Sequence, residues 1–349
     1  MKFAIIAAAA ARFPTIIVVV TIGVILGAFL AMHPPAATTA AYAQSTAASA
    51  ANGSTGPADF NIAAVGDWGC DSATEDTVNN IISKSPEVVL GLGDNAYEVP
   101  ADCWFETVDP IIDKMITAIG NEDVEPRGNV DEYMNRFGLS EQYYTYRYGN
   151  VFVLVMASEV PDEEGSEQFD FVERSLSEAS SDPNVDWIIV MYHRLMYASP
   201  SASATSSGVA ETYHEMFEEH GVDLVLQGHI HNYERSAPIV FDGEESDSPI
   251  SASTGRQTYV DPEGQIFATV GTGGKSIHEF QGMNSYIQKQ YEGYGFLDIE
   301  IKNGGEGNSE DGSVQADDNS EDGNNASTLE ATFYANDGSI IDTFAIIKN

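Results

Sequence analysis

The sequence predicts an α/β fold, a sandwich in which two mixed β-sheets are flanked by helices. From residue 60 to about residue 226, short apolar runs alternate with amphipathic stretches, a pattern typical of strands joined by helical crossovers. In the last third of the chain, four strand-like stretches follow one another with little helix between them. Hydrophobic residues make up 43% of the 349 residues, which is enough for a packed core.

The same patterns predict the individual elements. Strands are expected at residues 60–65, 88–92, 116–119, 143–148, 151–157, 187–191 and 224–226, and then at 265–270, 295–301, 328–334 and 339–347. Helices are expected at residues 74–83, 105–115 and 209–220, and around Phe169, Val172 and Leu176, whose i, i+3, i+7 spacing puts them on one helical face. Gly149 and Asn150 separate two of the strands and indicate a hairpin.

Residues 1–43 are expected to be an export signal. Lys2 and Arg12 supply a positive start, residues 16–32 form an uncharged apolar run, and Ala41-Tyr42-Ala43 offers a small-x-small cleavage pattern. The alternative is an uncleaved membrane anchor, because a run of that length nearly spans a bilayer. In either case the rest of the chain is expected to be secreted or extracytoplasmic.

Residues 44–58 are expected to be a linker, because Ala, Ser, Thr and Gly dominate them without apolar periodicity. The globular domain is expected to span residues 59–349. Within it, residues at about 303–326 are mostly Gly, Asn, Asp, Glu and Ser, and we expect a disordered acidic loop there. Cys70 and Cys103 are the only cysteines, and export to an oxidising compartment favours a disulfide between them.

Acidic residues far outnumber basic ones in this chain. There are 54 Asp and Glu residues against 15 Lys and Arg residues, and the formal net charge is -39. Such a surface repels polyanions and attracts cations, so we expect no nucleic acid among the partners.

Five short motifs with polar side chains each follow an expected strand. They are Gly66-Asp67-Trp68-Gly69, Gly93-Asp94-Asn95-Ala96-Tyr97, Gly120-Asn121-Glu122-Asp123, Tyr192-His193 and Gly228-His229-Ile230-His231. Because loops at the carboxyl ends of parallel strands converge on one crevice, these motifs can meet in space. Carboxylates, an amide, imidazoles and a phenol form a mixed oxygen and nitrogen set that suits iron, manganese or zinc. So many candidate ligands predict two ions that share a bridging aspartate.

The five motifs resemble those of the calcineurin-like metallophosphoesterases, and more narrowly those of the purple acid phosphatases. Most of that superfamily has a metal-binding histidine where this chain has Gly69, and purple acid phosphatases have a tyrosine in the second motif, as here at Tyr97. The stretches at 193–197 and 228–235 (GHIHNYER) are also similar to that family. The resemblance extends from about Phe60 to the C-terminus and implies the αββα metallophosphoesterase sandwich.

The resemblance also implies roles for individual residues. It assigns the first metal, a ferric ion in purple enzymes, to Asp67, Tyr97 and His231, the second, often iron, zinc or manganese, to Asn121, His193 and His229, and the bridge between them to Asp94. The implied reaction is hydrolysis of a small phosphate ester, in which a metal-bound hydroxide attacks phosphorus in line.

One position departs from the family pattern. Glu122 stands where purple acid phosphatases usually have a substrate-contacting histidine, and its carboxylate would repel a phosphate dianion unless it were protonated and served as a general acid. Arg194, beside a ligand, is the nearest basic residue that could compensate. The alternatives are therefore a phosphodiesterase on the same metals, or an exported metal-binding protein without turnover.

Two histidines outside the motifs are expected at the surface. His214 lies on an expected helix. His278 follows a glycine cluster, where an exposed turn is favoured over an approach to substrate.

Overall fold

A computed structural model describes residues 58–201, 208–241, 250–251, 257–303 and 326–349. The expected export signal lies outside the described residues, as do nearly all of the expected linker and acidic loop. Within the described ranges, no helix has the length and apolar character needed to cross a membrane.

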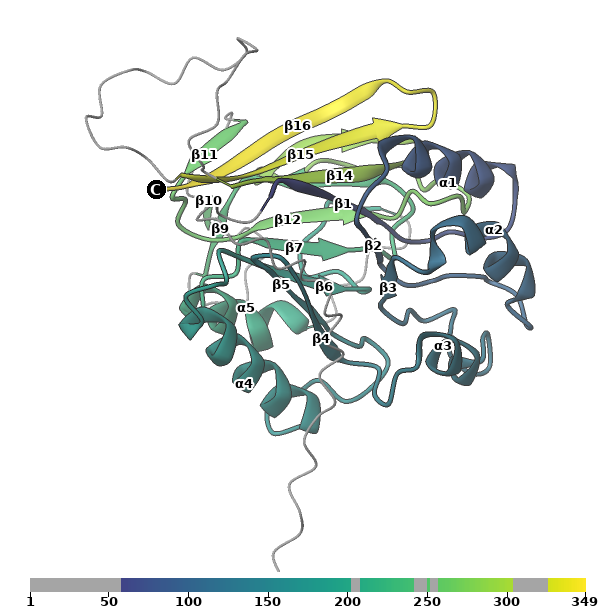
Figure 1. Cartoon of the computed structure of the whole chain (residues 1–349), viewed down its shortest axis with the longest axis horizontal. Coiled ribbons are helices and arrows are strands. Elements are labelled where there is room, and N and C mark those ends of the chain that lie inside the picture. Colours follow the sequence, from purple (N-terminus) through teal and green to yellow (C-terminus); the bar gives the residue numbers. More distant parts are fainter. Residues whose placement is uncertain (1–57, 202–207, 242–249, 252–256, 304–325) are drawn as a thin grey trace, which may run out of the picture. The chain divides into compact units, whose positions relative to one another are not determined.

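The described residues form two mixed sheets of seven strands each (Figure 1). The first sheet has the strand order β11 (Thr258–Val260), β16 (Ile340–Lys348), β15 (Ser327–Ala335), β14 (Gly295–Lys302), β1 (Phe60–Val65), β2 (Val88–Gly91) and β3 (Met115–Thr117). The second has the order β13 (Ile287–Tyr291), β8 (Tyr233–Ser236), β12 (Ile266–Val270), β7 (Leu224–Gln227), β6 (Trp187–Tyr192), β5 (Val151–Val155) and β4 (Tyr144–Tyr148). The strands β9 (Ile239–Val240) and β10 (Ile250–Ser251) form a separate two-stranded sheet.

Each sheet contains a block of neighbouring parallel strands. β1, β2 and β3 are parallel neighbours in the first sheet, and β5, β6, β7 and β12 are parallel neighbours in the second. These strands therefore end at a common edge of their sheet, which is where α/β folds collect functional loops. The antiparallel strands β14, β15 and β16 complete the first sheet.

Alternate side chains of β5 show how the layers pack. Val151, Val153 and Val155 belong to a core that also contains residues of the first sheet, whereas Phe152 and Leu154 belong to a second core. Because successive strand residues point to opposite faces, the first set lies between the sheets and the second faces the helices.

Four helices cover the outer faces of the sheets. The second core includes residues of α4 (Glu167–Ser181) and α5 (Val209–Glu219), which lie beside the second sheet (Figure 1). The first core includes residues of α1 (Ser72–Lys84) and α2 (Asp102–Ile112), beside the first sheet. The predicted sandwich of two mixed sheets flanked by helices is confirmed.

Several boundaries and elements differ from the prediction. The helix expected at 105–115 is α2 at 102–112, and β3 begins at Met115, which the prediction had placed in that helix. The prediction also missed α3 (Val130–Phe137), β8 and β13. The strands β8 (YERS) and β13 (IQKQY) contain few hydrophobic residues, so the apolar pattern that reveals the other strands is absent from them.

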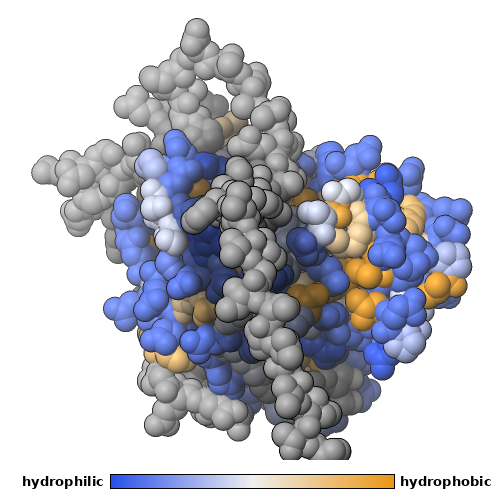
Figure 2. All heavy atoms as spheres, turned by 90° about the horizontal axis from the view of Figure 1, so that it is seen from below, coloured by the Kyte–Doolittle hydropathy of each residue, from blue (hydrophilic) through white to orange (hydrophobic). Residues whose placement is uncertain are grey.

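The surface reflects the acidic composition. Hydrophilic side chains dominate much of the described surface in the view of Figure 2, and hydrophobic side chains gather in one area on its right-hand side. Exposed large hydrophobic residues in the described ranges are few, namely Ile82, Val99, Val260, Met283 and Ile340.

Candidate metal centre

Loops at the ends of five strands bring the seven predicted ligands together. Asp67 follows β1, Asp94 and Tyr97 follow β2, Asn121 follows β3, His193 follows β6, and His229 and His231 follow β7. The loops of the two sheets touch directly. The backbone N–H of His229 donates to Asp67 Oδ2 at 2.8 Å, and His193 Nδ1 lies 2.8 Å from the carbonyl oxygen of Leu92.

One group of side chains surrounds the hydroxyl of Tyr97. Its Oη lies 3.1 Å from Asp67 Oδ1, 3.3 Å from Asp94 Oδ2 and 2.9 Å from His231 Nε2. His231 Nε2 is also 3.4 Å from Asp67 Oδ1. Its other ring nitrogen, Nδ1, lies 2.7 Å from the carbonyl oxygen of Ser276, so the ring is held with Nε2 facing the group.

A second group lies on the other side of Asp94. His193 Nε2 is 3.2 Å from Asp94 Oδ1, while the contact with Tyr97 uses Oδ2. One potential ligand atom each from Asp94, His193 and His229 lie within 4.8 Å of one another. Asp94 therefore faces both groups, one with each carboxylate oxygen.

The donor atoms of the second group fit a metal ion. Asn121 Oδ1 and His229 Nδ1 are buried and make no hydrogen bond within the described part of the chain, and the buried His193 Nε2 contacts Asp94 Oδ1 at 3.2 Å. Buried polar atoms without a partner are costly and call for an explanation. An amide oxygen and two imidazole nitrogens beside a carboxylate form a ligand set that suits a transition metal.

The backbone at four of these ligands is strained. The φ angles are 57° at Asp67, 51° at Asp94, 60° at Tyr97 and 70° at His229, in the left-handed region that residues other than glycine rarely adopt. Such strain clusters at functional sites. A close approach explains Gly120, because a Cβ there would collide with the carboxylate of Asp94.

The carboxylates set the electrostatics of the metal-free centre. Burial alone would lower the pKa of His193, but the neighbouring Asp94 and Asp67 raise it to about 10. Burial and the positive His193 lower the pKa of His229 to about 4. Burial and the charges of Asp67 and Asp94 raise the pKa of Tyr97 well above its usual value. The negative potential of the centre therefore favours a bound cation.

Asp123 holds two of the loops together, a role that the sequence does not reveal. Its fully buried carboxylate accepts hydrogen bonds from the Asn95 backbone at 2.8 Å, the Asn95 side chain at 2.9 Å and the Gly120 backbone at 2.9 Å. These contacts join the loop after β2 to the loop after β3. Burial and the charge of Asp94 raise the pKa of Asp123 to about 7.

The two predicted catalytic residues are both ion-paired. Glu122 Oε1 accepts from Asn121 Nδ2 at 2.9 Å and from Arg127 Nη1 at 2.6 Å. Arg194 Nε donates to Glu159 Oε1 at 2.8 Å. The sequence prediction missed Arg127, although it is a lone basic residue soon after the third motif.

Neither histidine expected at the surface is simply exposed. His278 is half-buried and its ring stacks on His231, with centroids 4.0 Å apart and planes 14° apart. Lys275, on the same loop, places Nζ 4.2 Å from the ring centroid of Tyr97.

The prediction for His214 is wrong, because the residue is fully buried and its Nδ1 lies 2.8 Å from Tyr197 Oη. The helix turns this side chain toward the core.

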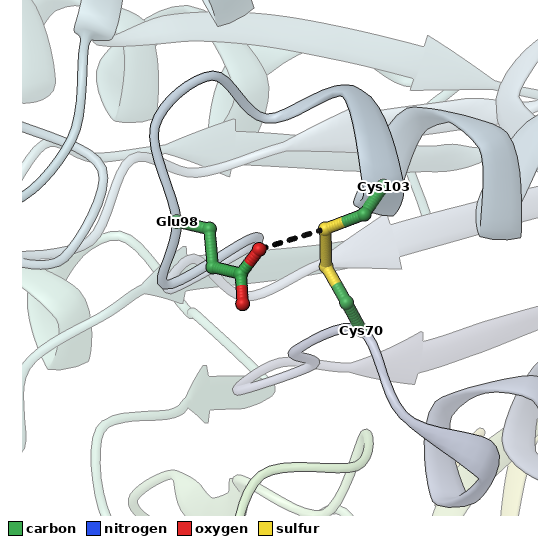
Figure 3. Close-up of side chains that lie close together, drawn as sticks. All are labelled: Cys70, Glu98 and Cys103. Carbon is green, nitrogen blue, oxygen red and sulfur yellow. Dashed lines mark hydrogen bonds between the residues drawn. A yellow bond between two sulfur atoms is a disulfide. The ribbon is translucent and has the colours of Figure 1, made fainter.

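A disulfide between Cys70 and Cys103 joins two ligand-bearing regions (Figure 3). Cys70 lies three residues after Asp67, and Cys103 lies in the first turn of α2, which follows the Tyr97 loop. The carboxylate of Glu98 points toward the bond, with Oε2 3.7 Å from Cys103 Sγ.

Comparisons with known proteins agree with this geometry. The sequence profile of the calcineurin-like phosphoesterases matches residues 60–233, and the chain belongs to this superfamily. Within the superfamily it is similar to the purple acid phosphatases. Purple acid phosphatase 15 of Arabidopsis thaliana is 24% identical over 255 residues, which cover 61% of this chain and 44% of that protein. Probable inactive purple acid phosphatase 1 of the same plant is 26% identical over 250 residues, covering 62% and 39%.

A solved structure shows the same fold. A purple acid phosphatase from yellow lupin (Lupinus luteus) seeds superposes with a TM-score of 0.67 and 20% sequence identity, covering 84% of this chain and 54% of that one. The chain thus spans about half the length of the curated relatives it matches.

Proposed function

We propose that this chain is an exported hydrolase of small phosphate esters that works with two metal ions. The observation that carries the proposal is the convergence of five strand-end loops on one centre, where the buried Asn121 Oδ1 and His229 Nδ1 make no hydrogen bond among the described residues. Membership of the calcineurin-like phosphoesterases supports a phosphate ester as substrate. The similarity to purple acid phosphatases supports a pair of metal ions at this centre.

The ligands divide between two metal positions. We assign the first ion to Asp67, Tyr97 and His231, the second to Asn121, His193 and His229, and the bridge to Asp94. The contacts of Asp94 support this division, because one of its oxygens faces Tyr97 and the other faces His193. The phenol suits iron(III) in the first position, and the amide and imidazoles suit iron, zinc or manganese in the second. A metal pair of this kind supplies Lewis acidity and lowers the pKa of water.

Side chains around the metal positions would bind and orient the substrate. Arg194 carries terminal N–H groups that suit the oxygens of a phosphate, and Glu159 holds its guanidinium through Nε. For Glu122, we propose an orienting role in place of general acid catalysis. Its Oε1 accepts hydrogen bonds from both Asn121 and Arg127, so the carboxylate is placed to hold the amide and the guanidinium in fixed orientations.

The disulfide supports export to an oxidising compartment. Cys70–Cys103 is a bond of the kind that persists outside the cytoplasm. We therefore propose that the chain acts after export, with small phosphate esters as partners and without nucleic acid, whose polyanionic backbone the net charge of -39 repels.

Metal analysis and a visible spectrum of the purified chain test this proposal. We expect two metal ions per chain and a visible absorption band from iron bound to tyrosinate. Asp94→Ala should lose metal and activity together, whereas Asp182→Ala, outside the five motifs, should keep both. Rates on 4-nitrophenyl phosphate and bis(4-nitrophenyl) phosphate separate a monoesterase from a diesterase. Metal binding without hydrolysis of either ester would identify a non-catalytic protein.

A further inference from the structure

One carboxylate oxygen links a proposed metal ligand to an arginine. Glu122 Oε1 accepts from Asn121 Nδ2 and from Arg127 Nη1, so the amide and the guanidinium meet at the same atom. The backbone N–H of Glu122 donates to Asp94 Oδ1 at 2.8 Å. Arg127 is therefore connected to Asn121 through the single side chain of Glu122, although it lies six residues beyond Asn121 in the sequence.

Most N–H groups of the Arg127 guanidinium make no hydrogen bond within the described residues. Its guanidinium carries five N–H groups, and within the described ranges Glu122 is the only hydrogen-bond partner found for them. The side chain of Arg127 is 59% exposed, whereas that of Glu122 is 23% exposed, so the arginine is the more accessible partner. An anion arriving from solvent would meet the guanidinium before the carboxylate.

Arg194 is held in the same manner from the second sheet. Glu159 accepts from its Nε, the described residues provide no partner for its two terminal nitrogens, and the side chain is 30% exposed. Arg194 directly follows His193, a residue of the centre, where the chain leaves β6. Each arginine thus has one N–H group engaged by a glutamate and other N–H groups free.

We propose that Arg127 and Arg194 form an anion clamp for the phosphate of the substrate, and that Glu122 is a positioning residue for Arg127 and Asn121. Two guanidinium groups match the two charges of a phosphate monoester dianion, whereas a diester carries one. The clamp therefore favours monoesters. This inference rests on the proposed function for the identity of the substrate, but not for the binding of phosphate itself.

The clamp also accounts for the departure at Glu122. A carboxylate near the substrate would repel a dianion, but an ion pair with Arg127 offsets that charge and adds a cation beside the position. The contact with Asn121 Nδ2 fixes which way the amide faces, and Asn121 Oδ1 is buried without a hydrogen bond among the described residues, so it is available to a metal ion. Glu122, which stands where the family has a histidine, is thus accompanied by a basic residue, Arg127.

Calorimetric titration of the metal-loaded full chain with inorganic phosphate tests the clamp. Arg127→Gln should weaken phosphate binding by about tenfold to a hundredfold, as expected for one lost hydrogen bond between charged groups. Arg136→Gln is the matched control, since it removes the same charge from an exposed arginine on α3, and it should bind phosphate as the wild type does. Both variants should keep the wild-type metal content.

The positioning role of Glu122 has its own readouts. Glu122→Ala should weaken phosphate binding nearly as much as Arg127→Gln, whereas Glu122→Gln retains an acceptor oxygen and should recover most of the affinity. In steady-state assays with 4-nitrophenyl phosphate, Arg127→Gln should raise KM more than it lowers kcat.

The outcomes separate this inference from the proposed function. Equal phosphate affinity in wild type, Arg127→Gln and Arg136→Gln, or no phosphate binding by the wild type, would overturn the clamp even if the chain hydrolyses esters. Conversely, selective loss of phosphate binding in Arg127→Gln would support the clamp even if no ester is hydrolysed, and only the proposed function would then fail.

Discussion

A buried ion pair between Arg235 and Asp342 joins the two sheets, and removing one partner should destabilise the whole domain. Arg235 lies on β8 of the second sheet and Asp342 on β16 of the first. Arg235 Nε is 2.6 Å from Asp342 Oδ2, and Nη2 is 3.1 Å from Oδ1. The hydroxyl of Tyr233 also donates to Asp342 Oδ2, at 2.9 Å. We therefore choose Asp342→Ala as the perturbation.

The burial of this pair sets the size of the effect. Arg235 is 2% exposed and Asp342 is 5% exposed, so the variant leaves a guanidinium charge in the interior with no carboxylate beside it. Breaking a buried pair in this way costs about 3–5 kcal/mol of unfolding free energy. For a domain of this size, the midpoint of thermal unfolding should fall on the order of 10 °C.

Thermal unfolding followed by circular dichroism measures the effect. Asp182→Ala is the matched control, because it breaks the Arg147–Asp182 pair, whose side chains are 39% and 32% exposed, and it should change the midpoint far less. The double variant Arg235→Leu with Asp342→Leu should recover part of the stability lost in Asp342→Ala. Equal midpoints for Asp342→Ala and Asp182→Ala would refute the reasoning from burial.

Three other changes have definite expected outcomes. Tyr97→Phe removes only the hydroxyl, so the iron-loaded protein should lose its visible band while keeping metal at the second position, and a retained band would exclude Tyr97 as its source. Replacing Cys70 and Cys103 by Ser opens a loop with a sequence separation of 33 residues and should cost about 3–4 kcal/mol in denaturant unfolding, with wild type in reductant behaving alike. Burial, partly offset by Lys348, raises the pKa of Asp223 from 3.8 to about 6, so the folded state keeps a proton that the unfolded state releases. This group should therefore lower wild-type stability as pH rises from about 4 to about 6, and urea titrations of Asp223→Asn should show a shallower fall over that range than those of the wild type.

The sequence predicts the fold best where apolar residues follow a clear period. The strand expected at 60–65 is β1, and the hairpin expected around Gly149 and Asn150 is formed by β4 and β5. The prediction from sequence fails at β8, where charged residues are buried. Glu234 is 2% exposed because it accepts from the Ser199 backbone at 2.6 Å and from Gln290 Nε2 at 3.2 Å. Such partners lie far away in the sequence, so the local pattern indicates a solvent-exposed segment.

The short helix α3 was missed for a different reason. It has a capping residue, Asn129, and Gly138 follows it in the left-handed conformation, so both termination signals are present in the sequence. Its apolar residues Val130, Tyr133, Met134 and Phe137 also have the i, i+3, i+4, i+7 spacing of a helix. The sequence therefore contains the signals of α3, and the prediction passed over them because the segment is only eight residues long and buries a single side chain, Tyr133, completely.

The candidate site also has a part that the sequence predicts and a part that it does not. The ligand types and their positions after strands can be predicted, because parallel strands bring their carboxyl ends together. The supporting contacts cannot, because Asp123 and His278 act through residues on other loops, and Arg127 reaches Glu122 only through the conformation of the loop that carries both. The sequence shows that Glu122 departs from a pattern, but only the structure pairs it with Arg127.

The strained backbone of the ligands explains why those supporting contacts are needed. A left-handed conformation costs a residue other than glycine on the order of 1–2 kcal/mol, and several ligands adopt it. Three successive backbone hydrogen bonds offset this cost by joining the loop after β1 to the loop after β2. They run from Asp67 N to Gly93 O, from Trp68 N to Asp94 O and from Gly69 N to Asn95 O, each at 3.0 Å.

These hydrogen bonds hold the loops of Asp67 and Asp94 side by side, and the disulfide joins Cys70, a few residues after Asp67, to Cys103 in α2, which follows the Asp94 loop. Two carboxylates at such short range repel each other, so the chain holds them together by covalent and backbone bonds. A centre built in this way has its ligands oriented by the fold itself. Binding of a metal ion would therefore not have to order these loops, which lowers its free-energy cost. The negative potential that destabilises the metal-free centre would also attract the ion.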